Sequence, residues 1–296
     1  MGKFALNGTT INQYFFGGSE VGQQYLGPLL GQGSGGDVSY DGDYAIHTFT
    51  ASGEFTVSEY NLAEVEILVV AGGGAGQSGG NIAVVGGYSG AGGGAGGVVY
   101  IESSANYTVA PSTYTITVGT GSAPATFTAD NGQDSSFIGG TISLTALGGG
   151  GVASISSNTG GSSAGVYGGV IIASCGAGSP AAPIATQPTA SGDSGTYGFG
   201  NNGGLATNCV VGSPYTHLLT GGGGGGAGGA ASTTTGGAGK SISITGTPVT
   251  YAIGGTANSG ASVTGYGSGG NGGTVNTNNP SAGNSGVVIV RYKYQA

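Results

Sequence analysis

Short runs of β-branched and aromatic residues recur along the chain, bounded by Gly, Ser, Asn or Pro. Residues 65–70 end in a continuous apolar run, which is typical of a buried strand. Two runs, 45–50 and 54–57, flank Ser52-Gly53 and predict a hairpin. No segment carries helix formers at a helical period, so the pattern predicts an all-β protein. The other predicted strands are 98–101, 107–109, 114–118, 142–147, 242–244, 249–253 and 287–292.

Glycine-rich runs separate these strands, at 72–97, 148–170, 221–239 and 254–273. Backbones without β-carbons can pack side by side as extended helices of polyproline-II geometry and exchange N–H···O=C bonds with their neighbours. The alternative is that the runs are flexible loops, but long unstructured loops are unusual inside a compact domain. We therefore expect a β-sandwich-like body that contains ordered polyglycine-II segments.

A ten-residue repeat occupies the N-terminal region, and each unit places an apolar residue before a two-residue turn signal: Asn7-Gly8, Gly17-Gly18 and Gly27-Pro28. The repeat predicts a small β-hairpin module that needs a surface to dock on. Because residues 31–36 have the composition of a linker, we expect a docking module over 1–36 and a glycine-rich domain over 37–296. The apolar positions expected to make the docking contact are Leu6, Ile11, Phe16, Val21 and Leu26.

The chain has 296 residues, of which 72 are glycine and only 9 are proline. No Gly-X-Y period is sustained, so a collagen triple helix is excluded. Hydrophobic residues make up 37% of the chain, which argues against a fully disordered protein. Ordering glycine costs roughly 0.5–1 kcal/mol per residue relative to alanine. We therefore expect dense hydrogen bonding between backbones, or burial against further copies of the chain.

Four basic residues stand against twelve acidic ones, which gives a net charge of −8. Nucleic-acid binding needs a basic stripe, so we expect no nucleic-acid partner. All acidic residues lie at or before Asp193, and the nearly uncharged C-terminal third indicates a closed oligomer, for which we expect a homotrimer. The N-terminus lacks the apolar stretch of a signal peptide, and no run is long enough to span a bilayer. We therefore expect neither secretion by that route nor membrane insertion.

The sequence gives little support for enzyme activity or for cofactor binding. The two histidines, His47 and His217, have no cysteine or carboxylate at metal-ligand spacing, and nothing marks a nucleophile beside them. Residues 235–241 resemble the end of a phosphate-binding loop, but position 234 is Thr where that motif needs Gly, and a predicted strand follows where it needs a helix. We therefore expect no enzyme activity and no cofactor.

Two further groups of residues leave alternatives open. Asp37, Asp41 and Asp43 could supply oxygen ligands to Ca²⁺, although acidic turns are more often solvated, and we expect no metal site. Cys175 and Cys209 could form a disulfide if the fold brings them together. In a chain made in the cytosol, two free thiols are the expectation.

The span 179–219 differs in composition from the glycine-rich runs, because prolines and aromatic residues alternate there with small polar residues. Rigid aromatic rings among Ser, Gly and Asn make adaptable contact surfaces, and the few charges favour stacking on sugars. The alternative is that these rings only cap the glycine-rich packing. The residues expected to contact a receptor are Tyr197, Phe199, Tyr215 and His217.

Several of these blocks, taken in order, resemble the glycine-rich domain of bacteriophage appendage proteins, including tail-fibre tip adhesins. The resemblance covers residues 45–292, and the blocks that carry it are Phe49–Val57, Val65–Gly74, Gly92–Tyr100, Tyr114–Gly119, Gly132–Phe137, Leu144–Gly151 and Gly286–Tyr292. Tip adhesins stack polyglycine-II helices in layers and expose variable loops. This chain departs from them by enclosing its glycine blocks within regular strands.

The resemblance implies a virion structural protein, assembled in the host cytoplasm, that acts as a tail or neck fibre component in host attachment. Its expected partners are other virion proteins, through the N-terminal module, and a glycan or protein of the host surface. The alternative is a capsid decoration or head-fibre protein with the same fold and docking module. An ice-binding or surface-binding protein is a third class, but we expect that class to carry a secretion signal and a flat threonine face.

Overall fold

The computed structural model describes residues 3–6, 9–16, 19–28, 31–82, 86–124, 126, 128–152, 159–164, 184–206, 220–275, 277 and 279–294. Within these residues the strands pair antiparallel, and helix is confined to α1 (Asp193–Thr196) and the 3-10 turns η1 (Ser103–Ala105) and η3 (Gln187–Thr189). The prediction of an all-β protein is confirmed. None of the helices among the described residues has the length and apolar character of a membrane span.

The larger sheet of the body has six strands in the order β15-β11-β8-β18-β6-β5. β18, at the C-terminal end of the described chain, lies between β8 and β6, so this sheet pairs the last strand of the body with two of its early strands. The strands are β5 (Asp37–Asp41), β6 (Tyr44–Phe49), β8 (Ala63–Val70), β11 (Val98–Ile101), β15 (Gly198–Phe199) and β18 (Val287–Lys293).

A second sheet has five strands in the order β14-β13-β12-β7-β4. Its edge strand β4 lies in the segment that composition predicts as a linker, and it pairs with β7 through Gly33 opposite Val57. The body therefore includes residues upstream of the predicted boundary at residue 36. The strands are β4 (Gln32–Ser34), β7 (Gly53–Ser58), β12 (Ser112–Thr117), β13 (Ser135–Gly139) and β14 (Ile142–Ala146).

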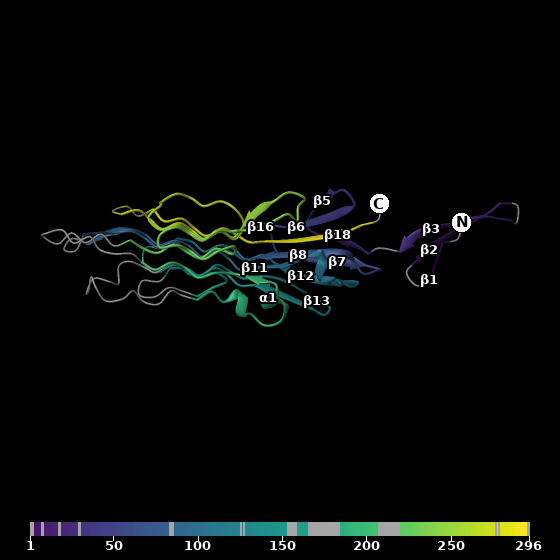
Figure 1. Cartoon of the computed structure of the whole chain (residues 1–296), viewed down its shortest axis with the longest axis horizontal. Helices are drawn as coiled ribbons and strands as arrows, with labels where there is room; N and C mark the ends of the chain where they lie inside the picture. The colour runs from purple at the N-terminus through teal and green to yellow at the C-terminus, as the bar shows by residue number, and fades with distance from the viewer. Residues whose placement is uncertain are drawn as a thin grey trace.

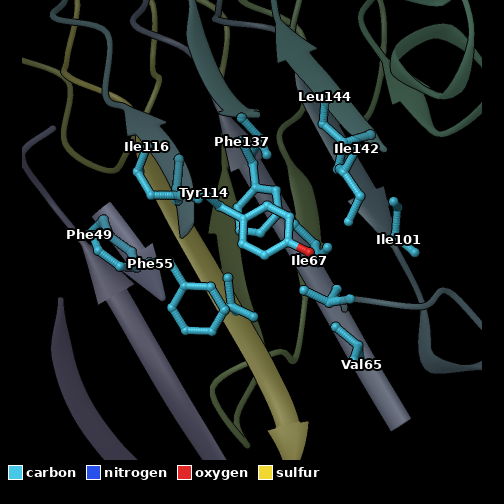
Figure 2. Close-up of a cluster of buried hydrophobic side chains, with 14 of the residues drawn as sticks. Phe49, Phe55, Val65, Ile67, Ile101, Tyr114, Ile116, Phe137, Ile142 and Leu144 are labelled. Carbon is cyan, nitrogen blue, oxygen red and sulfur yellow. The ribbon is translucent and has the colours of Figure 1, made fainter. Parts of the chain in front are cut away.

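The main hydrophobic core lies between these two sheets (Figure 2). Alternate residues of β7 and β12, such as Phe55 and Tyr114, are buried, while their neighbours in sequence face solvent. From the six-stranded sheet, Ile67 and Ile101 pack against them. The two sheets therefore form the predicted sandwich, with period-two burial on the smaller sheet.

The six-stranded sheet is covered on its other face as well. Leu68 and Val70 of β8 belong to a second core cluster together with Ile244 and Tyr251. The latter two residues come from the segment that contains the hairpin of β16 (Lys240–Ile242) and β17 (Val249–Tyr251). The second half of β8, residues 67–70, is therefore buried on both faces, which explains its continuous apolar run.

The hairpin predicted around Ser52-Gly53 is wrong. β6 pairs with β5 and β18 in one sheet, whereas β7 pairs with β4 and β12 in the other. The turn between β6 and β7 therefore crosses from sheet to sheet. Phe49 and Phe55 meet across the core, with ring centroids 6.3 Å apart. Both rings are buried in the main core.

The N-terminal module is a three-stranded antiparallel sheet of β1 (Lys3–Leu6), β2 (Thr9–Phe16) and β3 (Ser19–Pro28). Two of its predicted turns fall between these strands, but the third does not, because Gly27 and Pro28 end β3 and Pro28 is in register with Thr9. Figure 1 shows this sheet at one end of the long axis, with the glycine-rich runs extending toward the other. The predicted docking positions Leu6, Ile11, Phe16, Val21 and Leu26 all fall in its strands.

Candidate functional site

The glycine-rich runs form a lattice of parallel and antiparallel backbones, and residues 92–97 lie inside it. Their six N–H groups donate in a repeating order of three. Gly92 and Ala95 donate to Gly222 and Gly225, at 3.0 Å in each case. The next pair in the repeat, Gly93 and Gly96, donates to Gly270 and Gly267, and the third pair, Gly94 and Gly97, donates to Gly150 and Leu147, all at 2.8–2.9 Å. A period of three is that of polyglycine II, the packing that the sequence predicts for these runs.

Carbonyl groups of the same run accept bonds from three further segments. Gly255 donates to Gly93, Gly74 donates to Gly94, and Ser162 donates to Ala95, at 2.9–3.0 Å. Residues 92–97 therefore have backbone neighbours in six segments, near positions 74, 148, 162, 223, 255 and 268. All residues of this run are buried. All six N–H groups, and the carbonyl groups of Gly93, Gly94, Ala95 and Gly97, are thus bonded to other backbones rather than to water.

Close approach, rather than backbone conformation, explains why glycine is needed here. A Cβ at Gly92 would lie 2.0 Å from the carbonyl oxygen of Gly255, and one at Gly93 would lie 2.2 Å from that of Gly74. No side chain fits at such distances. The ordering cost of glycine is therefore offset by backbone hydrogen bonds that a larger residue would prevent.

Asparagine side chains hold the loops that connect the lattice runs. Asn271 accepts a bond from the Thr256 N–H at 2.7 Å and donates to the Ala261 carbonyl at 2.9 Å. Asn284 donates to the carbonyl oxygens of Val263 and Gly265, at 2.8 and 3.0 Å. These amides replace backbone partners where the chain leaves the lattice, so the described loops are fixed at their bases.

Two of the four predicted receptor-contact residues lie in the body. Tyr197 follows α1 and packs against the main core, and its carbonyl accepts a bond from the Tyr100 N–H at 3.0 Å. Phe199 lies in β15 opposite Val98, and the Lys240 ammonium lies 4.0 Å from the centroid of its ring. Both rings are partly buried, so each has a structural contact as well as an exposed part.

The other two predicted contact residues, Tyr215 and His217, lie outside the described residues, as do Cys175 and Cys209. The described part of the span 179–219 includes two exposed apolar side chains that the sequence analysis did not single out. Ile184 is 66% exposed and Leu205 is 39% exposed. The segments that carry them are joined by a 2.8 Å bond from the Ala185 N–H to the Asn202 side chain. Single aliphatic residues in a polar segment give no sequence signal that separates them from core positions.

A charged cluster lies on β8 and β18. Arg291 bonds to Glu66 at 2.6 Å and to Asp41 at 3.4 Å. The Tyr100 hydroxyl donates to Glu66 at 2.6 Å, and burial together with this bond raises the pKa of Tyr100. One of the three candidate calcium ligands is therefore engaged by an arginine. Among the described residues, no three His, Cys, Asp or Glu side chains gather where they could hold a metal ion.

His47 is buried between the sheets and is 1% exposed. Its Nδ1 lies 2.7 Å from the Gly35 carbonyl oxygen, and its Nε2 lies 3.2 Å from the Tyr292 hydroxyl. Burial lowers the pKa of His47 below its ordinary value of 6.5, although the bond to Gly35 opposes this. Neutral imidazole satisfies both contacts by donating from Nδ1 and accepting at Nε2, so this tautomer fits the site.

We expect the free energy of unfolding to fall as the pH drops from 7.5 to 5.5, because the unfolded chain protonates His47 near its ordinary pKa while the folded protein resists protonation. Above that pKa the residue is neutral in both states and contributes no pH dependence. Urea denaturation at several pH values measures the effect, with His47→Gln as the control variant. An equal slope in the variant would show that other groups cause the dependence.

A family model described as a glycine-rich domain matches residues 48–293. This range begins in β6 and ends at the last residue of β18, so it contains the whole described lattice and all of the sandwich except β4, β5 and most of β6. No curated protein matches the chain. With the family model covering most of the sequence, the chain belongs to the glycine-rich domain family.

Proposed function

We propose that the protein is a non-enzymatic structural component of a bacteriophage virion, a tail or neck fibre protein that contributes to host attachment. The observation that carries the proposal is the buried run 92–97, bonded to six neighbouring segments. A lattice held by backbone bonds is stiff and uses few side chains, so its surface loops can vary without loss of the fold. Such a body suits a protein that presents contact loops at a distance from the particle.

The positions of the N-terminal sheet and of the glycine-rich runs along the long axis support separate roles for the two parts. The small N-terminal sheet lies at one end, and the glycine-rich runs extend to the other (Figure 1). An isolated sheet of this size is marginally stable in water and gains stability by docking on a larger surface. In the proposal it binds other virion proteins, while residues of the span 179–219 contact a host glycan or protein. A homotrimer would present three sets of weak contacts and gain avidity from their effective concentration.

Binding of the purified full chain to host cells tests the attachment role. We expect the double variant Tyr215→Ala, His217→Ala to bind at least about tenfold more weakly, since aromatic contacts dominate such surfaces. The matched control is Tyr266→Ala, which removes a tyrosine that is 39% exposed elsewhere on the body. Unchanged binding of the double variant, with wild-type stability, would contradict the assigned contact residues.

Reconstruction of the virion that carries this protein tests the appendage. The proposal expects density for the chain on the tail or neck, attached through residues 1–30. A position on the head lattice would favour a capsid decoration or head-fibre protein instead. Normal incorporation of a chain that lacks residues 1–30 would contradict the docking role of the N-terminal sheet.

A further inference from the structure

A groove at the edge of the sandwich stands apart from the lattice and from the residues predicted to contact a receptor. Its volume is about 340 Å³, and it is lined by residues of β4, β5, β6 and the C-terminal end of β18. The described residues that line it include no Asp, Glu, Lys or Arg. In a chain with a net charge of −8, such a surface disfavours anionic ligands.

Exposed rings form one wall of the groove. β5 is the edge strand of the six-stranded sheet, and all five of its residues are exposed. Tyr40 is 63% exposed and Val38 is 48% exposed. The ring of Tyr294 lies 4.9 Å from that of Tyr40, centroid to centroid. Two adjacent tyrosines thus offer flat apolar faces, with their hydroxyl groups available for hydrogen bonds.

The floor of the groove is polar, rigid and uncharged. The Tyr292 hydroxyl accepts a bond from the Gly33 N–H at 2.7 Å and lies 3.2 Å from His47 Nε2. His47 in turn holds the carbonyl of Gly35 through Nδ1. These contacts fix β4 against β18 before any ligand binds. Pockets that bind small molecules combine such a preformed apolar wall with a few fixed polar groups.

We propose that this groove binds a neutral saccharide, with a sugar ring stacked on Tyr40 and its hydroxyl groups bonded to exposed polar groups of the lining such as Ser34. An anionic glycan would find no Lys or Arg among the described lining residues. Figure 1 places β5 at the end of the body that faces the N-terminal sheet, and none of the groove's lining residues belongs to the span 179–219. The proposal does not depend on the virion role, and each can fail without the other.

Titration of the full chain with neutral and acidic oligosaccharides tests the groove. The neutral probes are oligomers of glucose, mannose and N-acetylglucosamine, and the acidic probes are uronic-acid and sialylated oligomers. We expect at least one neutral series to bind with a dissociation constant of about 1 mM or tighter by calorimetry. Tyr40→Ala should weaken binding at least about tenfold, whereas Tyr40→Phe should retain most of it because the ring remains.

Tyr266→Ala is the matched control and should bind like the wild-type chain. Circular dichroism and urea denaturation establish that each variant is folded. Three results would overturn the proposal: no binding of any neutral series at about 10 mM, stronger binding of the acidic probes, or wild-type affinity in a folded Tyr40→Ala protein. Association of two chains through β5, seen as a dimer that Tyr40→Ala dissolves, would assign the surface to a second copy instead.

Discussion

Replacement of Gly94 with alanine should lower the free energy of unfolding by about 3 kcal/mol or more. A Cβ at this position would lie 2.2 Å from the Ser162 carbonyl oxygen and 2.6 Å from the carbonyl carbon of Ser163. Both neighbours are backbone atoms held in the lattice, so neither can turn aside as a side chain would. The run must move, and the bonds that Gly94 exchanges with Gly150 and Gly74 lengthen or break. Urea denaturation of the full chain measures the loss.

Gly53→Ala is the matched control for this substitution. Gly53 begins β7, is exposed, and has no atom within 4 Å of the position that a Cβ would occupy. We expect its effect to stay within about 0.5 kcal/mol. If both alanine variants had wild-type stability, residues 92–97 would not be packed as described. If both lost stability equally, the cost would come from glycine replacement in general and not from the lattice.

Truncation of Phe55 to alanine should cost about 3–5 kcal/mol of unfolding free energy. Phe55 is fully buried, and its ring centroid lies 6.1 Å from that of Phe137 and 5.1 Å from that of the His47 imidazole. It also lies beneath β4, where a Cβ on Gly33 would come within 2.4 Å of the ring. The cavity would therefore open at the centre of the sandwich, beside the edge strand that connects the body to the N-terminal sheet. Chemical denaturation monitored by circular dichroism measures the cost.

Two variants calibrate that measurement. Phe55→Leu keeps most of the apolar volume and should cost less than half as much as the alanine variant. Ile138→Ala removes a side chain that is 44% exposed on β13, next to the buried Phe137, and should cost about 1 kcal/mol or less. A small effect of Phe55→Ala, comparable to that of Ile138→Ala, would contradict the packing of the two sheets around this ring.

The local pattern of the sequence identified most strands of the sandwich but not their pairing. β8 was recognisable from its apolar run, and β12 and β18 from their β-branched and aromatic residues. β5 was missed, because all five of its residues are exposed and the strand therefore has no buried face to give an apolar run. The apparent hairpin at Ser52-Gly53 was wrong because a tight turn gives no information on whether the next strand stays in the same sheet.

For the glycine-rich segments, the sequence predicts the kind of packing but not which segments are neighbours. Their composition was enough to predict polyglycine-II packing, since only backbone hydrogen bonds can offset the cost of ordering so many glycines. Neighbours could not be predicted, because a residue without a side chain carries no pairing information. Gly94 bonds to Gly74 nearby in sequence but also to Gly150, and Gly93 bonds to Gly270. The groove beside Tyr40 could not be predicted from the sequence either, because it forms only where β4, β5 and β18 meet at one edge of the sandwich.

Amide hydrogen exchange over residues 92–97 of the full chain tests the central claim most directly. If these glycines are structural, their N–H groups should exchange as slowly as those of Leu68 and Val69 in β8, which open only when the body unfolds. The six bonds they donate, at 2.8–3.0 Å, require this protection. Exchange at the rate of an unstructured peptide, in a protein whose β8 amides stay protected, would show that the glycine-rich runs are mobile tethers and not a lattice.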